Sequence, residues 1–109
     1  MSSCDYDFVP DVYATIAEPN RRRILALLRE SERPAGEIVA ALGLAQPAVS
    51  KHLKALKAAG LATSRVDGAR RLYRLTPGPL AEVDAWLSDY RAFWTGRLNA
   101  LDDHLQRSD

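Results

Sequence analysis

The stretch from Leu44 to Leu61 carries the polar side chains that are best spaced to contact another molecule. It predicts one helix, with Pro47 in the first turn and Gly60 just past the end. At about 100° per residue, one face is apolar and the opposite face is polar, then cationic. The apolar stripe holds Val49, Leu53 and Leu56, and the outer face holds Gln46, Ser50, Lys51, Lys54 and Lys57. A helix that reads base edges needs such a face, although an ordinary solvated helix also shows it.

The net charge of +1 hides a partition of charge along the chain. Residues 1–19 carry four acidic residues and no Lys or Arg, whereas residues 20–76 carry twelve Lys or Arg against four acids. Residues 77–109 are acidic again, with three Arg against six acids. A basic centre between acidic ends indicates that the middle of the chain faces a polyanion. Short segments also fluctuate in charge by chance, but this excess coincides with the polar helix.

Three shorter helices are predicted before the polar helix. They span about Pro10 to Ala17, Pro19 to about Ser31, and Pro34 to the glycine at position 43. The link from Gly43 to Gln46 is then a turn of three or four residues. Two helices joined by so short a turn, with the polar face on the second, make a helix-turn-helix.

After Gly60 the apolar pattern changes to the period of strands. Residues 61–66 and 70–75 alternate, and Asp67-Gly68 between them is a strong signal for a hairpin turn. A hairpin after the recognition helix would be the wing of a winged helix. Its basic residues, Arg65, Arg70 and Arg71, flank the turn and would reach the DNA backbone or minor groove. Charged edges that only blunt aggregation are the alternative reading.

A long helix is predicted over residues 80–106, with apolar residues at spacings of three and four. These apolar residues form a continuous row, or seam, along the helix. The small winged core can cover neither this seam nor the apolar face of the first helix. We therefore expect a homodimer that buries both terminal helices, within residues 9–17 and 80–106. Its predicted contacts are Val9, Val12, Tyr13, Ile16, Leu80, Val83, Leu87, Tyr90, Trp94, Leu98 and Leu101, with Trp86 and Phe93 on a second row. A monomer whose last helix folds back is the alternative.

Composition and length suit one domain, which we place at residues 9–109 after a flexible tail at residues 1–8. The chain lacks an apolar run of the roughly 20 residues that a membrane span needs, and its first residues do not resemble a signal peptide. We therefore expect a cytoplasmic protein that does not contact a membrane. No catalytic triad, phosphate loop or metal cluster is evident, so we do not expect an enzyme. The single cysteine, Cys4, is an incidental residue or a reactive thiol.

With these segments assembled, residues 10–105 resemble the ArsR/SmtB family of bacterial winged-helix repressors. The resemblance rests on Pro19-Asn-Arg-Arg-Arg-Ile-Leu, Gly36-Glu-Ile, Gln46-Pro-Ala-Val-Ser-Lys-His-Leu-Lys-Ala-Leu, Ala59-Gly-Leu and Gly68-Ala-Arg-Arg-Leu-Tyr-Arg-Leu. It implies a homodimeric, autoregulatory repressor that binds an inverted-repeat operator in double-stranded DNA. It also implies that the first and last helices form the dimer.

The resemblance departs from the family at the metal sites. Metal-sensing members place paired cysteines in the helix before the recognition helix, where this chain has Gly36-Glu-Ile-Val-Ala-Ala-Leu. Other members place Asp and His ligands along the last helix. Here Asp89, Asp102, Asp103 and His104 occur, but a second histidine is missing. We therefore expect no metal and no cofactor, as in the metal-independent branch, and leave any inducer unknown.

The predicted DNA contacts combine the outer face of the polar helix with the wing. They are Gln46, Pro47, Ser50, Lys51, His52, Lys54, Arg65, Arg70 and Arg71. His52 lies at the flank of the apolar stripe, where it either donates to a phosphate or packs as a half-buried histidine. Two other functions stay open: a winged-helix module that binds protein and not DNA, and a metal- or redox-responsive repressor with an unusual site.

Overall fold

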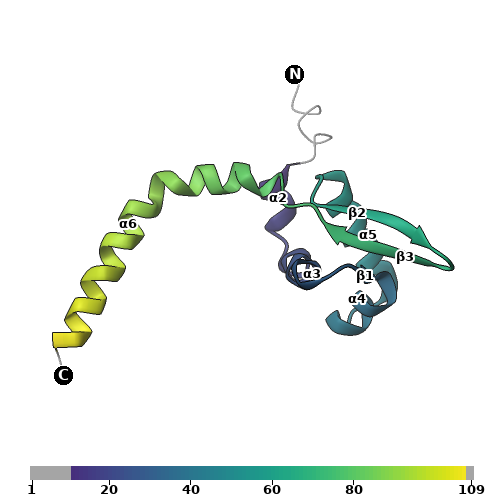
Figure 1. The fold of residues 1–109 in the computed structure, drawn as a ribbon, viewed down its shortest axis with the longest axis horizontal. Helices are drawn as coiled ribbons and strands as arrows, with labels where there is room; N and C mark the ends of the chain where they lie inside the picture. The colour runs from purple at the N-terminus through teal and green to yellow at the C-terminus, as the bar shows by residue number, and fades with distance from the viewer. Residues whose placement is uncertain (1–10, 108–109) are drawn as a thin grey trace, which may run out of the picture.

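The computed structural model describes residues 11–107, and the side chains of residues 11–97. A compact head of helices and a small sheet is followed by one long helix that leaves it (Figure 1). The elements are α2 (Val12–Ile16), α3 (Pro19–Glu30), β1 (Arg33–Pro34), α4 (Ala35–Leu42), α5 (Gln46–Ala58), β2 (Ala62–Asp67), β3 (Arg70–Leu75) and α6 (Leu80–Arg107). This mainly helical winged fold with a long last helix confirms the predicted fold class. No helix in the described part is long and apolar enough to cross a membrane.

The helices α3, α4 and α5 pack around one apolar core. Ile24 of α3, Ile38 of α4 and Leu53 of α5 are almost fully buried there. The predicted stripe of α5 is confirmed, since Val49 and Leu56 are buried with Leu53. α4 ends at Gly43 in the left-handed conformation, with φ of 69°, and α5 begins three residues later. The helix-turn-helix therefore has the short turn that the sequence predicts.

The end of α5 fixes where the wing begins. Gly60 has a φ of 78°, and its N–H donates to the carbonyl oxygen of Lys57 at 3.0 Å. The N–H of Leu61 donates to the carbonyl oxygen of Leu56 at 2.9 Å. This pair of bonds is a Schellman motif, which places the buried side chains of Leu56 and Leu61 together. The chain thus leaves α5 in one direction and enters β2.

The sheet has three antiparallel strands in the order β1-β3-β2, one more than the predicted hairpin. β1 was missed because it is only two residues long, and because the sequence placed the start of a helix at Pro34. That helix begins one residue later, and Pro34 pairs with Leu72 across the sheet. The wing turn consists of Gly68 and Ala69, between the paired Asp67 and Arg70. A positive φ of 65° at Gly68, and not at Ala69, is the pattern of a type II′ hairpin turn.

The first helix is shorter than predicted. α2 begins after Asp11, whose carboxylate accepts from the N–H of Tyr13 at 2.9 Å, and ends before Glu18 caps α3. Val12 was expected on a dimer surface, but it is only 5% exposed and belongs to the core of its own chain. A side chain that is already buried has little surface left for a partner. Val12 is therefore corrected to a core residue.

Some predictions fall outside the described residues. The tail at residues 1–8, Cys4 and Val9 lie before the described part of the chain. The side chains of Leu98, Leu101 and His104 also lie outside it, although their backbone belongs to α6. The domain division, the tail and the contacts of these residues stay predictions.

Candidate nucleic-acid interface

The outer face of α5 presents its predicted polar residues to solvent. Gln46, Ser50, Lys51 and Lys54 are exposed, and so is Pro47 in the first turn. Ala45 precedes the helix and provides no side-chain cap. The structure thus exposes five predicted contacts on the side of α5 that the buried stripe leaves free.

His52 differs from the other predicted contacts on α5 because its ring faces the protein. Its side chain is 13% exposed, and Nε2 lies 3.2 Å from Oε2 of Glu18. Its Nδ1 accepts from Nε of Arg21 at 3.3 Å. Both ring nitrogens are occupied, so neither remains to donate to a phosphate. The phosphate assignment of His52 is therefore corrected to a contact that holds α5 against the start of α3.

The wing carries its arginines on two opposite faces, which the sequence prediction grouped together. Because alternate residues of a strand face opposite sides, Arg71 shares a face with Ser64 and Arg70 shares the other with Arg65. The Ser64 hydroxyl lies 2.9 Å from Nζ of Lys57 and 3.3 Å from Nη1 of Arg71. Two cations, one from α5 and one from the wing, thus meet at one hydroxyl. Lys57 and Ser64 were not among the predicted contacts, although the helical period already put Lys57 on the outer face.

Arg65 and Arg70 already have carboxylate partners. Arg65 donates to both oxygens of Glu32, at 2.8 and 3.0 Å, and Nη2 of Arg70 lies 3.5 Å from Asp67. The hydrogen bond from Arg65 and its positive charge hold the pKa of Glu32 below its usual 4.5 despite some desolvation. These partners reduce the net charge that the far face of the wing offers to a polyanion. Arg71 has no carboxylate partner among the described residues.

The predicted dimer residues are only partly covered by the chain itself. Ile16, Leu80 and Val83 are half-buried against the core, as is Tyr13. The Tyr13 hydroxyl donates to the carbonyl oxygen of Glu82 at 3.1 Å, and its ring meets Trp86 edge to face at 6.0 Å. From this junction onward α6 leaves the head (Figure 1), and four large aromatic side chains of this helix are exposed. These are Trp86 at 51%, Tyr90 at 44%, Phe93 at 64% and Trp94 at 47%.

No group of three or more His, Cys, Asp or Glu side chains that could hold a metal is present within residues 11–97. The residues of the predicted last-helix set include Asp102, Asp103 and His104, whose side chains lie outside this range. Independence from metals therefore stays a prediction.

Comparisons with known proteins agree on one family. Residues 18–64 match the family described as bacterial regulatory proteins of the arsR family. The chain is 44% identical over 77 residues to the HTH-type transcriptional repressor SmtB of Mycobacterium tuberculosis, covering 71% of this chain and 57% of that one. It is 40% identical over 90 residues to the HTH-type transcriptional regulator Rv2034 of the same organism, covering 82% and 81%.

A solved structure shares the fold. The ArsR-like transcriptional regulator from Rhodococcus sp. RHA1 superposes with a TM-score of 0.65 at 30% identity, over 89% of this chain and 92% of that one. The relatives are named as transcriptional regulators and repressors, and the described domain is that of a helix-turn-helix regulator rather than an enzyme. The chain belongs to the ArsR family of bacterial regulatory proteins.

Proposed function

We propose that the chain is a transcriptional repressor that binds an inverted-repeat operator as a homodimer in the cytoplasm. α5 enters the major groove, and the wing formed by β2 and β3 contacts the backbone or minor groove. The observation that carries this proposal is the exposed face of α5, where Gln46 and Ser50 precede Lys51 and Lys54. Polar groups in the first turns reach base edges, and cations farther along reach phosphates.

The distribution of charge supports a polyanionic partner. The excess of eight positive charges lies within residues 20–76, which include the whole helix-turn-helix and wing. Lys57 and Arg71 extend the cationic surface of α5 onto the wing, because both reach Ser64. A continuous cationic strip across two elements fits a DNA backbone that passes from α5 to the wing.

The exposed aromatic side chains of α6 support a second copy as the other partner. Contiguous apolar surface of this kind is costly in water unless another surface covers it. A two-fold axis would pair the α6 helices and place two copies of α5 on one side of the dimer. Two recognition helices related by symmetry would read two half-sites, which explains an inverted repeat.

The proposal is tested by isolating the genomic fragments that the protein retains and sequencing them. We expect one enriched inverted repeat, protected over two half-sites in a footprint. Gln46→Ala should weaken that operator at least tenfold, since a bidentate contact to adenine contributes about 1–3 kcal/mol of discrimination per half-site. Its affinity for scrambled duplex should stay within about twofold.

The alternative of a protein-binding winged helix predicts a different result. In that case no fragment is enriched, and the protein shows no salt-sensitive shift with genomic DNA. If a repeat is enriched but Gln46→Ala binds like the unmodified chain, base reading by this residue is wrong although DNA binding stands. A loss of operator affinity on adding Zn²⁺ or arsenite would instead favour the metal-responsive alternative.

A further inference from the structure

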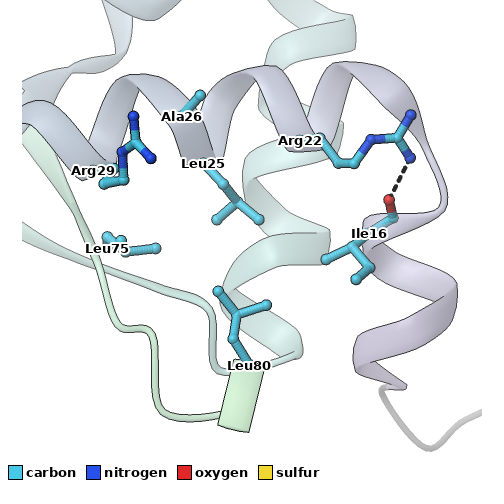
Figure 2. Close-up of a pocket in the computed structure, with 7 residues that line it drawn as sticks. All are labelled: Ile16, Arg22, Leu25, Ala26, Arg29, Leu75 and Leu80. Atoms are coloured by element: carbon cyan, nitrogen blue, oxygen red, sulfur yellow. Dashed lines mark hydrogen bonds between the residues drawn. The ribbon is translucent and has the colours of Figure 1, made fainter. Parts of the chain in front are cut away.

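A pocket of about 300 Å³ opens beside α3, away from the polar face of α5. Four elements form its walls, since Ile16 comes from α2, Leu25 from α3, Leu75 from β3 and Leu80 from α6. Figure 2 shows these four aliphatic side chains converging on one space. The remaining lining residues are Arg22, Ala26 and Arg29. The floor is therefore apolar, and every charged group among the seven is a cation.

The two arginines lie at opposite ends of this pocket along α3 (Figure 2). Nη1 of Arg22 donates to the carbonyl oxygens of Ile16 and Ala17, at 2.7 and 3.1 Å. Those neutral acceptors fix the guanidinium but leave its charge uncompensated. Arg29 is exposed and forms no ion pair within the described side chains. A pocket with an apolar floor and uncompensated cations at its rim attracts an anion that has an apolar body.

We propose that this pocket binds an organic carboxylate whose apolar body lies on Leu25, Leu75 and Leu80. Its carboxylate meets the guanidinium of Arg29, at the end of the pocket where no carbonyl competes. A volume of about 300 Å³ is at the lower end of the range of small-molecule sites, so the ligand is a medium-sized molecule. None of the relatives' names that place the chain in its family mentions such a ligand.

A second copy of the chain is the competing occupant of an apolar surface, and the pocket differs from the dimer surface in two respects. It shares Ile16 and Leu80 with the predicted dimer contacts, but its other lining residues come from α3 and β3, and the exposed aromatic residues of α6 begin only at Trp86. Its walls come from four elements around a volume of about 300 Å³, and such a concave site fits a small molecule better than the side of a partner's helix.

A ligand in this pocket would contact elements of both the head and the proposed dimer interface. An occupant touches α2 and α6, which are proposed to form the dimer, together with α3 and β3 of the head. A change in their relative position would alter the spacing of two α5 helices across the dimer. This effect on operator affinity rests on the proposed function, whereas binding of the carboxylate does not.

The test is isothermal titration of the full chain with decanoate, kept below its micelle concentration, in the absence of DNA. We expect saturable binding at one site per chain, and binding of decanol about tenfold weaker because it lacks the charge. Arg29→Gln should weaken decanoate about tenfold and leave decanol unchanged. Ala26→Phe, at an exposed position of the pocket wall, should abolish the binding of both by filling the space.

Arg97→Gln is the matched control, since it removes an exposed cation from α6 far from the pocket and should leave both affinities unchanged. Circular dichroism should give the same spectrum for all variants. No saturable binding of decanoate to the unmodified chain would overturn the proposal. Equal weakening by Arg29→Gln and Arg97→Gln would also overturn it, because only a general charge effect would then remain. Because no DNA is present, either failure leaves the proposed repressor function standing.

Discussion

The cationic residues of the wing differ in how far their charges are already compensated. Arg71 faces α5 and touches only a hydroxyl, whereas Arg65 is held by both oxygens of Glu32. We expect Arg71→Gln to weaken operator and scrambled duplex alike, and to reduce the salt slope by about one unit per protomer. Arg65→Gln should change that slope by less than half as much. Anisotropy titrations on both duplexes at several salt concentrations measure the two slopes.

Lys51→Gln supplies the comparison for these wing variants, because it removes an exposed cation from α5 itself. It should reduce the salt slope as Arg71→Gln does. If Arg65→Gln had the larger effect of the two wing changes, the DNA would lie on the face of the wing opposite to the one proposed. If neither changed the slope, the wing would not contact phosphate.

The Glu32–Arg65 pair also makes a prediction about acid stability. The folded pKa of Glu32 lies below its usual 4.5, because Arg65 favours the charged carboxylate. The contribution of the pair is therefore fully present above that value, and it is lost as the pH falls through the lower folded pKa. We expect Glu32→Gln to flatten the fall in stability between about pH 5 and pH 3. Urea midpoints of both proteins across that range measure it, and parallel curves would contradict it.

The sequence predicted the exposed residues of α5 better than those that face the chain itself. Gln46, Ser50 and Lys54 follow from helical period alone, because their exposure depends only on the helix and its buried stripe. His52 was wrongly assigned because its partner Glu18 comes from the turn before α3, 34 residues earlier. The partner of Arg65 was missed for the same reason, since Glu32 lies in a distant segment of the chain. Contacts between segments far apart in the sequence depend on packing, which no local pattern reports.

At the scale of elements, the junction of α5 with the wing depends on one backbone conformation. Gly60 has a φ of 78°, and an added Cβ there would lie 3.4 Å from Cγ of Pro79. The strain comes from the left-handed conformation, which costs a residue with a side chain about 1–2 kcal/mol. We expect Gly60→Ala to lower the free energy of unfolding by about that amount, as measured by urea denaturation.

Gly36 in α4 provides the matched control, because its φ is not positive and an added Cβ would meet nothing within 4 Å. Gly36→Ala should leave stability unchanged or raise it by about 0.4–1 kcal/mol, since alanine restricts the unfolded chain. Equal losses in the two variants would show that the left-handed turn at Gly60 is not what limits stability.

The boundaries of the elements were predictable where a single residue marks them through its own backbone preference. Pro19, Gly43 and Gly60 mark helix ends through their own backbone preferences, and the hairpin turn is marked by Gly68. β1 and the exact ends of α2 were not predictable in this way, although the helix itself was. A two-residue strand has no period, and it exists only because β3 offers its edge.

At the scale of the whole molecule, α6 determines the shape. The chain extends over 59 Å in its longest dimension, and Figure 1 shows that α6 projects from the head. It touches the head mainly through α2, where Tyr13 joins both helices. Farther along α6, Tyr90, Phe93 and Trp94 are exposed among the described side chains. Whether a second copy of the chain buries the predicted seam of α6 is therefore tested directly.

That test uses residues of the seam whose substitution leaves the head intact. Leu87 is half-buried and Trp94 is 47% exposed, and neither belongs to the core. Changing both to Asp would place carboxylates in the interface of the proposed dimer, at a cost of several kcal/mol. We expect a monomer in sedimentation equilibrium at concentrations where the unmodified chain is a dimer, with an unchanged helical spectrum. The loss of the dimer should also remove most operator affinity, since a monomer contacts only one half-site.

Ala92→Asp adds one carboxylate at an exposed position about half a turn round α6 from Trp94. It should leave the dimer intact, because it lies outside the row of seam residues. If Ala92→Asp dissociated the dimer as well, the loss would reflect added charge on α6 and not the seam. If the double variant stayed dimeric, the interface would lie elsewhere, and the exposed aromatic residues of α6 would be left for a different partner.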